Sequence, residues 1–545
     1  MSSQHGIAKL ALSGFQVFDS LTEIPLKRLT LIFGPNSAGK SSVEDAISIL
    51  ERIWTQHATE IDWSKLNIDV LRHWRRTGAG ANDKAPLMQL NATFLDSVDV
   101  NESFCMTTGR PLREERFYQS DSPLVSSFEL RTTIVLSELG KARHDVSRRD
   151  VFADNLFLFS ITLEGEQAIN FGHPALSQLT VKVDFEEAAG NAPSLLSYAN
   201  GVVTLKNHPF PELLNWRFPN FRAVASEMLP FEGESPEEIS NYREVLSCIP
   251  EIKEFSLFLN LLDAIFSETA SFNAKIVSAS RHVPSNDELT FLIDAPEGFG
   301  IRDSGDESYR LLAKSYVDWH VGQDMESNLN DSVPQPIFMA VNSFLTDHLF
   351  AERGYCLGFD YRKISRPAPG GVLDIEGVQG EGWPEESGHL VCVYLIDPQQ
   401  RRYLFEDVGS GLGYVLPVLC GVCEPSTKIV MLQQPELHLH PALQAVMGDV
   451  LIEAAMKRNG QPILAETHSE HLLLRVLKRV RQTHENSNTS PSLRISADDV
   501  GVLYFDPRPD GTTSVKRLRI SDDGEFMDRW PRGFFAERDK ELFDE

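Results

Sequence analysis

A glycine-rich stretch with one lysine is the part of the sequence best suited to phosphate chemistry. Its spacing is G-x-x-x-x-G-K-[ST], and this phosphate loop comprises Gly34, Pro35, Asn36, Ser37, Ala38, Gly39, Lys40, Ser41 and Ser42. In such a loop, backbone N–H groups and a helix N-terminus converge on a phosphate, and the lysine adds a positive charge. The Ser41 hydroxyl can bind Mg²⁺. The sequence therefore predicts a site for a nucleotide with its magnesium ion.

The segments on either side of the loop have the pattern that this chemistry needs. The apolar run Leu29–Phe33 predicts a buried strand that enters the loop. Apolar residues at helical spacing after the loop predict a helix from residue 41 to about 56. Further β-structure is expected at residues 7–12 and 15–21.

Two apolar runs far down the chain end in residues that can act on a phosphate. Residues 428–432 lead into Gln433 and Gln434, and residues 462–465 lead into Glu466, Thr467 and His468. Upstream, the sequence D-V-G-S-G at 407–411 opens a predicted helix. From Ser41 to Gln433 is 433 − 41 = 392 residues, more than one nucleotide-binding core needs. The two halves of the fold must therefore flank a large insertion.

The order of these motifs resembles that of the ATP-binding-cassette (ABC) family. More narrowly, it is similar to the AAA-like ATPases of the overcoming-lysogenization-defect group. In that group the acidic strand is followed by P-E-L-H-L-H-P, here the linking loop at 435–441, and the switch reads E-T-H-S-E-H, here at 466–471. The sequence R-W-P-R-G-F-F at 529–535 is similar to the tail of one subfamily, and S-R-H-V-P at 280–284 is the one match in the middle of the chain.

The resemblance implies an α/β fold: a P-loop NTPase of the ABC-ATPase head type, with a mixed β-layer, a parallel sheet and flanking helices. It also implies that two heads enclose two ATP molecules, each held by the phosphate loop of one head and the signature of the other. Gly409, Ser410 and Gly411 match the signature, and small residues there let backbone N–H groups approach the γ-phosphate. The resemblance assigns Mg²⁺ to Ser41 and Gln433.

Two glutamines stand where the family carries an acidic pair. A glutamine at Gln433 can contact a magnesium-bound water and one at Gln434 can orient an attacking water, but neither accepts a proton as a carboxylate does. Hydrolysis should therefore be slow or use another base, and Glu466 and His468 are the candidates, ahead of Glu436. Gly413-Tyr414 also stands where the subfamily often has Ser-Gln.

We expect three regions in the chain. Residues 1–140 form the N-terminal half of the ATPase head, residues 141–275 an inserted, partly helical lobe, and residues 276–545 the C-terminal half. Within the last region, residues 389–396 and 401–405 around Asp397-Pro398 are typical of a hairpin.

The composition restricts the class of protein. The chain has 545 residues, with 51 Lys+Arg against 78 Asp+Glu, a net charge of −27 that argues against nonspecific coating of DNA or anionic membranes. No apolar run is long enough to cross a bilayer, and the start lacks the pattern of a signal peptide, so we expect a cytoplasmic protein. The C-x-x-C at Cys420 and Cys423 is interpreted as two small core residues of an apolar helix.

Some residues allow two interpretations. Arg281 can fix a loop near the phosphates or tie a turn together through backbone carbonyls. The basic patch with Arg72, Arg75 and Arg76 can reach phosphates of a nucleotide or nucleic acid, or be a solvated helix end. His438 and His440 alternate as metal ligands would, but a role in the linking loop across the dimer is favoured.

Three hypotheses for function follow. The leading one is a homodimeric or higher homo-oligomeric ATPase that gates a separate nuclease, as in bacterial antiphage systems; the Septu-type pair of an ATPase with an HNH nuclease matches best. Nucleic acid would then be bound directly or through the partner, and no membrane is involved. The alternatives are a DNA-maintenance ATPase that clamps DNA between its heads, and a nucleotide-sensing scaffold without turnover.

Overall fold

The structure is a computed structural model that describes most of both ends of the chain and parts of its middle. The described part comprises residues 6–55, 60–62, 87–95, 104–105, 110–111, 127–135, 143–153, 156–162, 168–171, 180–184, 195–199, 202–206, 272–281, 304–324, 336–351, 353–366, 386–405, 410–487 and 489–531. The patch with Arg72, Arg75 and Arg76, signature residue Gly409 and residues 532–535 of the tail motif lie outside the described residues.

A six-stranded sheet brings the two ends of the chain together. Its strand order is β15-β19-β20-β3-β21-β22, and all neighbouring pairs are parallel except the last. The strands are β3 (Leu29–Phe33), β15 (Ala274–Val277), β19 (Ile429–Gln433), β20 (Ile463–Glu466), β21 (Val500–Pro507) and β22 (Thr513–Leu518). Because β3 lies between two strands from the far end of the chain, the two halves of the fold do flank a long intervening segment, as predicted.

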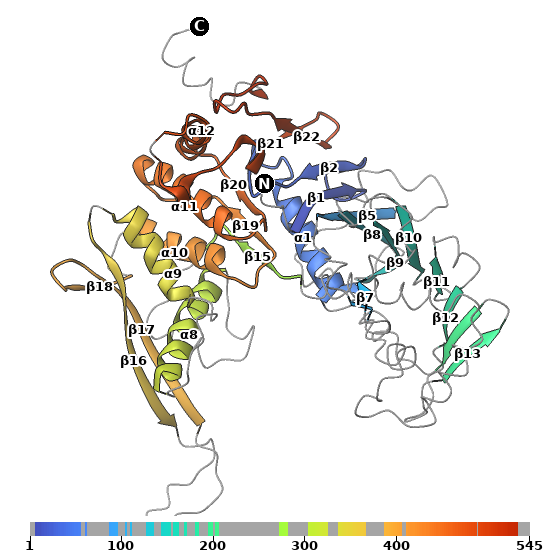
Figure 1. The fold of residues 1–545 in the computed structure, drawn as a ribbon, viewed down its shortest axis with the longest axis horizontal. Coiled ribbons are helices and arrows are strands. Elements are labelled where there is room, and N and C mark those ends of the chain that lie inside the picture. The colour runs from blue at the N-terminus through green and yellow to red at the C-terminus, as the bar shows by residue number, and fades with distance from the viewer. Residues whose placement is uncertain are drawn as a thin grey trace, which may run out of the picture.

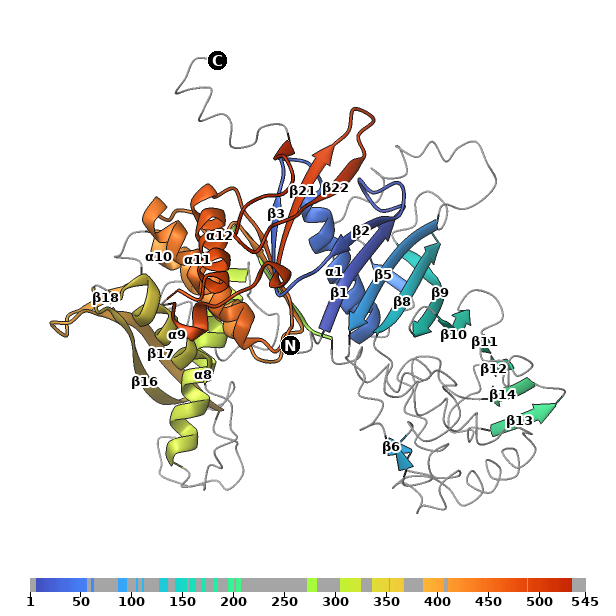
Figure 2. The same cartoon turned by 45° about the horizontal axis from the view of Figure 1, so that its top comes forward.

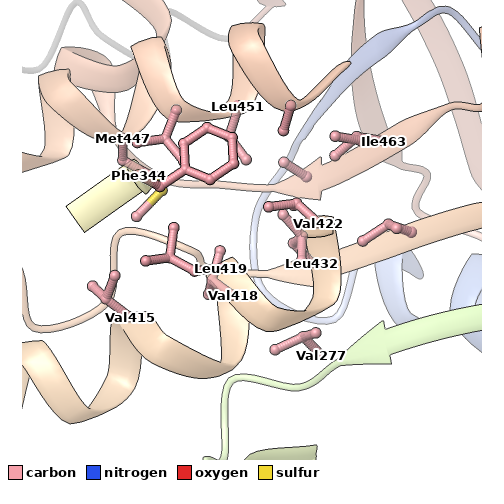
Figure 3. Close-up of a cluster of buried hydrophobic side chains, with 14 of the residues drawn as sticks. Val277, Phe344, Val415, Val418, Leu419, Val422, Leu432, Met447, Leu451 and Ile463 are labelled. Carbon is pink, nitrogen blue, oxygen red and sulfur yellow. The ribbon is translucent and has the colours of Figure 1, made fainter. Parts of the chain in front are cut away.

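Helices cover the sheet and close its core. The helix after the phosphate loop is α1 (Lys40–Thr55), which agrees with the prediction. On the other side are α10 (Ser410–Cys423), α11 (Pro441–Lys457) and α12 (Glu470–His484). Figure 3 shows Val418, Leu419 and Val422 of α10 packed between the sheet and α11. Cys420 is buried in this apolar helix and Cys423 is partly buried, which confirms their interpretation as packing residues.

A second, larger sheet lies on the other side of α1. Figures 1 and 2 both show α1 between the parallel sheet and this layer. The main path of the layer runs β13-β14-β12-β11-β10-β9-β8-β5-β1-β2, with β4 paired to β9. Its strands are β1 (Gly6–Ser13), β2 (Thr22–Pro25), β4 (Glu60–Asp62), β5 (Leu87–Leu95), β8 (Ser127–Val135), β9 (Arg143–Ala153), β10 (Leu156–Thr162), β11 (Ala168–Phe171), β12 (Thr180–Asp184), β13 (Leu195–Ala199) and β14 (Val202–Lys206). β6 (Phe104–Cys105) and β7 (Arg110–Pro111) form a separate pair.

This layer crosses the boundary that we expected at residue 140. β8 and β9 lie on either side of that residue and pair along eight positions of their register. The same sheet then continues to β14, so residues 143–206 extend the β-layer of the head in the described part of the chain. The helical segment expected near 236–267 lies outside the described residues, and the three-region division stays a proposal.

A small antiparallel sheet and two helices precede α10. The sheet consists of β16 (Cys356–Arg366), β17 (Glu386–Ile396) and β18 (Arg402–Leu404), and the helices are α8 (Ser304–Asp324) and α9 (Ile337–Phe344), which a π-helical turn at Leu345–Leu349 extends. The ring of Tyr316 on α8 stacks on Phe359 of β16 at 4.3 Å. Asp397 accepts backbone N–H bonds from Gln399 and Arg401 in the turn between β17 and β18, so the predicted hairpin is confirmed.

One predicted strand near the N-terminus is wrong. Residues 15–21 do not form a strand: Phe15 and Phe18 make an isolated bridge across a tight turn, and β2 begins at Thr22. The turn requires positive φ at Gly14 (63°) and Gln16 (48°), which no extended strand adopts. The apolar residues are there because Phe15 and Phe18 are buried, which imitates the alternation of a strand. Among the described residues, no helix is long and apolar enough to span a membrane.

Candidate nucleotide-binding site

The phosphate loop joins β3 to α1 and is pressed against neighbouring backbone. Gly34 has a φ of +148°, and a Cβ there would lie 2.7 Å from the Phe505 carbonyl oxygen of β21. Gly39 has a φ of +86°, and a Cβ there would lie 2.2 Å from Cγ2 of Val17. Both the backbone conformation and the lack of space exclude larger residues. The glycines of the motif are therefore needed for the shape of the loop itself.

Contacts from both ends of the chain hold the loop in place. The Thr513 hydroxyl of β22 donates to the Ala38 carbonyl at 2.9 Å. On the other side, Ser42 Oγ donates to Gln16 Oε1 at 2.5 Å, and Gln16 Nε2 donates to Asp45 Oδ2 at 2.7 Å. Sequence reasoning missed Gln16 and Thr513 because no local pattern marks contacts that span 26 and 475 residues.

Lys40 places its ammonium inside the loop. It is 5% exposed, and Nζ donates to the Gly34 carbonyl at 3.0 Å and to the Pro35 carbonyl at 2.9 Å. Its charged neighbour is Glu466, whose Oε1 is 3.5 Å away. Burial raises the pKa of Glu466, and the Lys40 charge opposes that rise. Lys40 is thus a buried cation aimed at the space that the loop encloses.

Three of the predicted catalytic and metal-binding residues meet at the ends of neighbouring strands. Gln433 of β19 is in register with Glu466 of β20, and Glu466 is in register with Ile32 of β3, one residue before the strand ends. Gln434 follows with a φ of +44°, and its backbone N–H donates to the Glu466 carbonyl at 2.7 Å. Gln433, Gln434 and Glu466 therefore lie together beside the phosphate loop.

Glu436 has a positioning role. Its Oε1 accepts the backbone N–H of His468 at 3.0 Å, and the residue is 6% exposed. Burial raises the pKa of its carboxyl group. His468 itself is exposed, and partial burial and the Lys40 charge lower its pKa, so its ring is mainly neutral at pH 7. Glu436 thus holds the backbone of the switch and leaves the His468 ring accessible.

Arg281 binds backbone carbonyls, which settles its two interpretations in favour of the turn. Its guanidinium donates to the carbonyls of Ser278 at 3.1 Å, Gln433 at 2.8 Å and Gln434 at 2.9 Å. The residue is 2% exposed. The turn that it fixes is therefore the end of β19, where the positive φ of Gln434 must be maintained.

The helix that carries the predicted signature packs directly on the loop at 435–441. α10 begins at Ser410, as predicted, and a Cβ on Gly411 would lie 2.7 Å from the His438 carbonyl oxygen. The Tyr414 ring lies 4.6 Å from the His438 ring, so the Gly413-Tyr414 departure adds an aromatic contact here. His440 caps α11: its Nδ1 accepts the Ala442 N–H at 3.3 Å. In the described part, no group of three or more His, Cys, Asp or Glu residues could hold a metal ion.

Glu44 is a further residue of the site that sequence reasoning missed. It lies on α1 one turn after Lys40, and its carboxylate accepts a hydrogen bond from Gln433 Nε2. Burial, with Asp45 and Glu466 nearby, raises its pKa to about 7. The one signal in the sequence was an acidic residue three positions after Ser41 in a motif whose usual acidic partners had become glutamines.

Strand order, loop and helix N-terminus together define the architecture. The phosphate-loop strand β3 is separated from β19 by β20, and a mainly antiparallel layer covers the other side of α1. The fold is that of an ABC-type ATPase head. The loop fits a nucleoside triphosphate with Mg²⁺: the backbone from Gly34 to Gly39 would surround the phosphates, Lys40 would bind them, and the exposed Ser41 would face the ion.

Comparisons with known proteins gave the following similarities. A family model described as a protein of unknown function, DUF3696, matches residues 495–544. No curated protein matches the chain. Among solved structures, the chain is similar to the Smc head bound to the C-winged helix domain of ScpA, with 11% identity, a TM-score of 0.37, and coverage of 94% of this chain and 98% of that one.

Two further head domains have a similar sequence identity, TM-score and coverage. The Smc head from Pyrococcus furiosus, with an extended coiled coil and bound to the C-terminal domain of ScpA, has 11% identity and a TM-score of 0.33, covering 94% of this chain and 96% of that one. The SMC head domain from Thermotoga maritima has 11% identity and a TM-score of 0.31, covering 94% and 100%. The assignment of the fold rests on the sheet and the loop themselves.

Proposed function

We propose that this chain is an ATP-binding, slowly hydrolysing ABC-type ATPase that dimerises around ATP. The observation that carries the proposal is the place of Lys40. Its buried ammonium lies in a glycine loop at a helix N-terminus, and the ends of β19 and β20 lie alongside. A buried lysine held by two carbonyls can exchange them for phosphate oxygens with little rearrangement.

The binding half of the site follows from the loop. Backbone N–H groups at the start of α1 favour negative charge, and Lys40 adds a point charge. Mg²⁺ would neutralise charge on the phosphates and would be held through Ser41, with Gln433 at the end of β19, beyond β20 in the same sheet.

The residues that would act in hydrolysis, at the ends of β19 and β20, are weak bases; we call them the hydrolytic half of the site. Gln434 can orient a water but cannot take its proton. Glu466 lies 3.5 Å from the Lys40 ammonium, whose charge opposes the rise in pKa that burial causes in this carboxyl group. His468 is mainly neutral and can hydrogen-bond a γ-phosphate or accept a proton. This set supports slow turnover with Glu466 and His468 as the proton acceptors. A general base contributes about 10²–10⁴-fold to a rate, so a poor one costs a large part of that factor.

The dimer is proposed from the position of the signature. Ser410 and Gly411 lie at the N-terminus of α10, where N–H groups point away from the helix and favour an anion. In the described part, no hydrogen bond or ion pair joins Gly411 to the phosphate loop of the same chain. Gly409, Ser410 and Gly411 would therefore complete the site of a second copy.

The pathway is proposed from the motifs. The linking loop at 435–441 and the switch at 466–471 are similar to those of ATPases that work with a separate nuclease in antiphage defence. We assign the chain to that role, with an HNH nuclease as the partner. Nucleic acid would be bound directly or through that partner.

One other function has an observation in its favour. Gln433 and Gln434 leave the end of β19 without a carboxylate, which suits a nucleotide-sensing scaffold that closes on ATP and does not hydrolyse it. Measurable turnover that Lys40→Ala abolishes would exclude this alternative.

The test combines oligomeric state with turnover. Light scattering after size exclusion should show the wild-type chain shift to a dimer when ATP and Mg²⁺ are added. Lys40→Ala and Ser410→Arg should both keep the oligomeric state of the nucleotide-free chain when ATP and Mg²⁺ are added. In Lys40→Ala, ATP binding is lost; in Ser410→Arg, the large side chain blocks the signature. Phosphate release should be slow in the wild type and absent in Lys40→Ala. An ATP-independent dimer with unchanged turnover in Lys40→Ala would contradict the proposal.

A further inference from the structure

Glu44 stands where a carboxylate would be useful to a magnesium ion. It follows Ser41 by three residues on α1, so the two side chains lie on the same face of the helix. On its other side is Gln433, the residue at the strand position where the ABC family carries an acidic residue associated with Mg²⁺. The Gln433 amide nitrogen donates to the Glu44 carboxylate. Strand β19 thus carries the amide of Gln433 where the family has a carboxylate, and this amide hydrogen-bonds the carboxylate of Glu44 on helix α1.

The orientation of the Gln433 amide is fixed by a second contact. Its Oε1 accepts the backbone N–H of Ala279 at 2.9 Å. The oxygen therefore faces β15 and the NH₂ group faces α1, so the partner on α1 must be an acceptor. A carboxylate at Glu44 meets that need and keeps a second oxygen for another ligand.

The other acids near the loop have their own partners. Asp45 accepts from Gln16 at 2.7 Å, Glu436 accepts from the His468 N–H at 3.0 Å, and Glu466 lies 3.5 Å from Lys40. Glu44 has the neutral amide of Gln433, and no lysine, arginine or histidine of the described residues forms an ion pair with it. Its carboxylate, like that of Asp45, has a neutral side-chain amide as its hydrogen-bond partner and no ion pair among the described residues.

An unbalanced charge in a half-buried place is costly unless a ligand compensates it. A second atom shows the same need: Oε2 of Glu466, in a residue 8% exposed, is buried with no hydrogen-bond partner in the structure. Both point to a cation beside the phosphate loop.

We propose that Glu44 supplies, from helix α1, the carboxylate that β19 lacks, and that it faces the Mg²⁺ of the bound nucleotide while Gln433 fixes its orientation. The inference rests on the proposed nucleotide-binding function. Mg²⁺ prefers oxygen ligands and commonly takes one or two carboxylates together with phosphates and waters. Ser41 and Glu44 on one helix face provide a hydroxyl and a carboxylate for that set.

The experiment measures metal binding apart from hydrolysis. Mn²⁺ replaces Mg²⁺ as a paramagnetic probe, and its binding to the full chain is followed by EPR with a saturating non-hydrolysable ATP analogue. Glu44→Gln should weaken Mn²⁺ binding by about tenfold or more, as expected when a carboxylate partner of a metal site is lost. Analogue binding in EDTA should change less than about twofold, because the loop and Lys40 stay intact.

Glu51→Gln is the matched control. Glu51 lies seven residues further along α1, on the same face, and its carboxylate is likewise partly buried and accepts a hydrogen bond, from the Ala274 N–H at 2.8 Å. It is about 10 Å further from the loop, so this variant removes the same charge without touching the metal position. Equal loss of Mn²⁺ binding in both variants, or no loss in Glu44→Gln, would overturn the inference.

The exchange Glu44→Gln with Gln433→Glu covers the case in which the single variant does not fold. It keeps the amide–carboxylate pair and returns the acid to the strand, so Mn²⁺ binding should lie within about threefold of the wild type; a loss as large as that expected for Glu44→Gln would count against the inference. Lys40→Ala distinguishes a failure of the proposed nucleotide-binding function from a failure of the proposed role of Glu44. If it leaves analogue binding unchanged, the proposed function fails; if it abolishes binding while Glu44→Gln keeps its Mn²⁺ affinity, the role of Glu44 alone fails.

Discussion

The phosphate loop and the end of β19 lie side by side and depart from the ABC-family pattern to very different degrees. The loop retains every residue of its motif, and its shape is enforced by close backbone contacts at Gly34 and Gly39. The end of β19 retains its backbone, held by Arg281, but carries Gln433 and Gln434 where the family has acids. Nucleotide binding and hydrolysis can therefore diverge separately, because one depends on backbone geometry and the other on two side chains.

The largest expected effect tests the binding side of this comparison. Lys40→Ala removes a buried charge that lies in the loop, and its loss leaves the phosphates without their one lysine there. ATP affinity should fall about 100-fold or more, in line with about 3 kcal/mol for a charge-assisted contact. Titration calorimetry with ATP and Mg²⁺ measures this, and circular dichroism shows whether the fold is kept. Affinity within threefold of the wild type would show that the loop does not bind the nucleotide.

The second prediction tests whether the loop depends on its shape as well as its charge. Gly39→Ala adds a Cβ that would lie 2.2 Å from Val17 Cγ2 at a φ of +86°. The strain is on the order of 1–3 kcal/mol, and ATP affinity should fall about thirtyfold.

Thermal unfolding of the nucleotide-free Gly39→Ala chain gives the control. Its midpoint should fall by a few degrees at most, since the strain is local. If ATP affinity stays unchanged, the loop is not the rigid element described above.

The third prediction concerns the end of β19, which Arg281 holds in place. Arg281→Ala leaves the carbonyls of Gln433 and Gln434 without their cation, and buried acceptors that lose a partner cost about 1–3 kcal/mol. Turnover should fall about tenfold while ATP affinity changes less than about threefold, because the damage lies in the hydrolytic half.

Arg281→Lys is the matched variant. It keeps the charge but cannot reach three carbonyls with a planar fork, so its turnover should lie between those of the wild type and Arg281→Ala. An equal fall of affinity and turnover in Arg281→Ala would mean that the two halves of the site are not separate.

The sequence was sufficient where a motif is local. The phosphate loop with its strand and helix, the start of α10 at Ser410, and the buried place of Cys420 follow from short patterns, and the structure confirms each. The expected strand at 15–21 failed because Phe15 and Phe18 alternate like a strand while closing a turn.

Contacts between distant segments could not be predicted. Gln433 and Glu44 are 389 residues apart, and Thr513 and Ala38 are 475 residues apart. No periodicity encodes such pairs, since they depend on how strands from both ends of the chain order themselves in one sheet. The extension of the β-layer to β14 is of the same kind, because pairing in a sheet is set by side chains on several strands together.

The phosphate loop retains its whole motif, whereas the end of β19 lacks the carboxylate that would serve hydrolysis. Single-turnover hydrolysis of ATP by the wild type and by Gln434→Glu measures the consequence of that difference. A carboxylate at the end of β19 should raise the rate at least about fivefold, a small part of the factor that a well-placed base contributes, because the backbone there is already held by Arg281. A wild type that binds ATP and hydrolyses it quickly, with Gln434→Glu equal or slower, would show that the end of β19 does not limit hydrolysis.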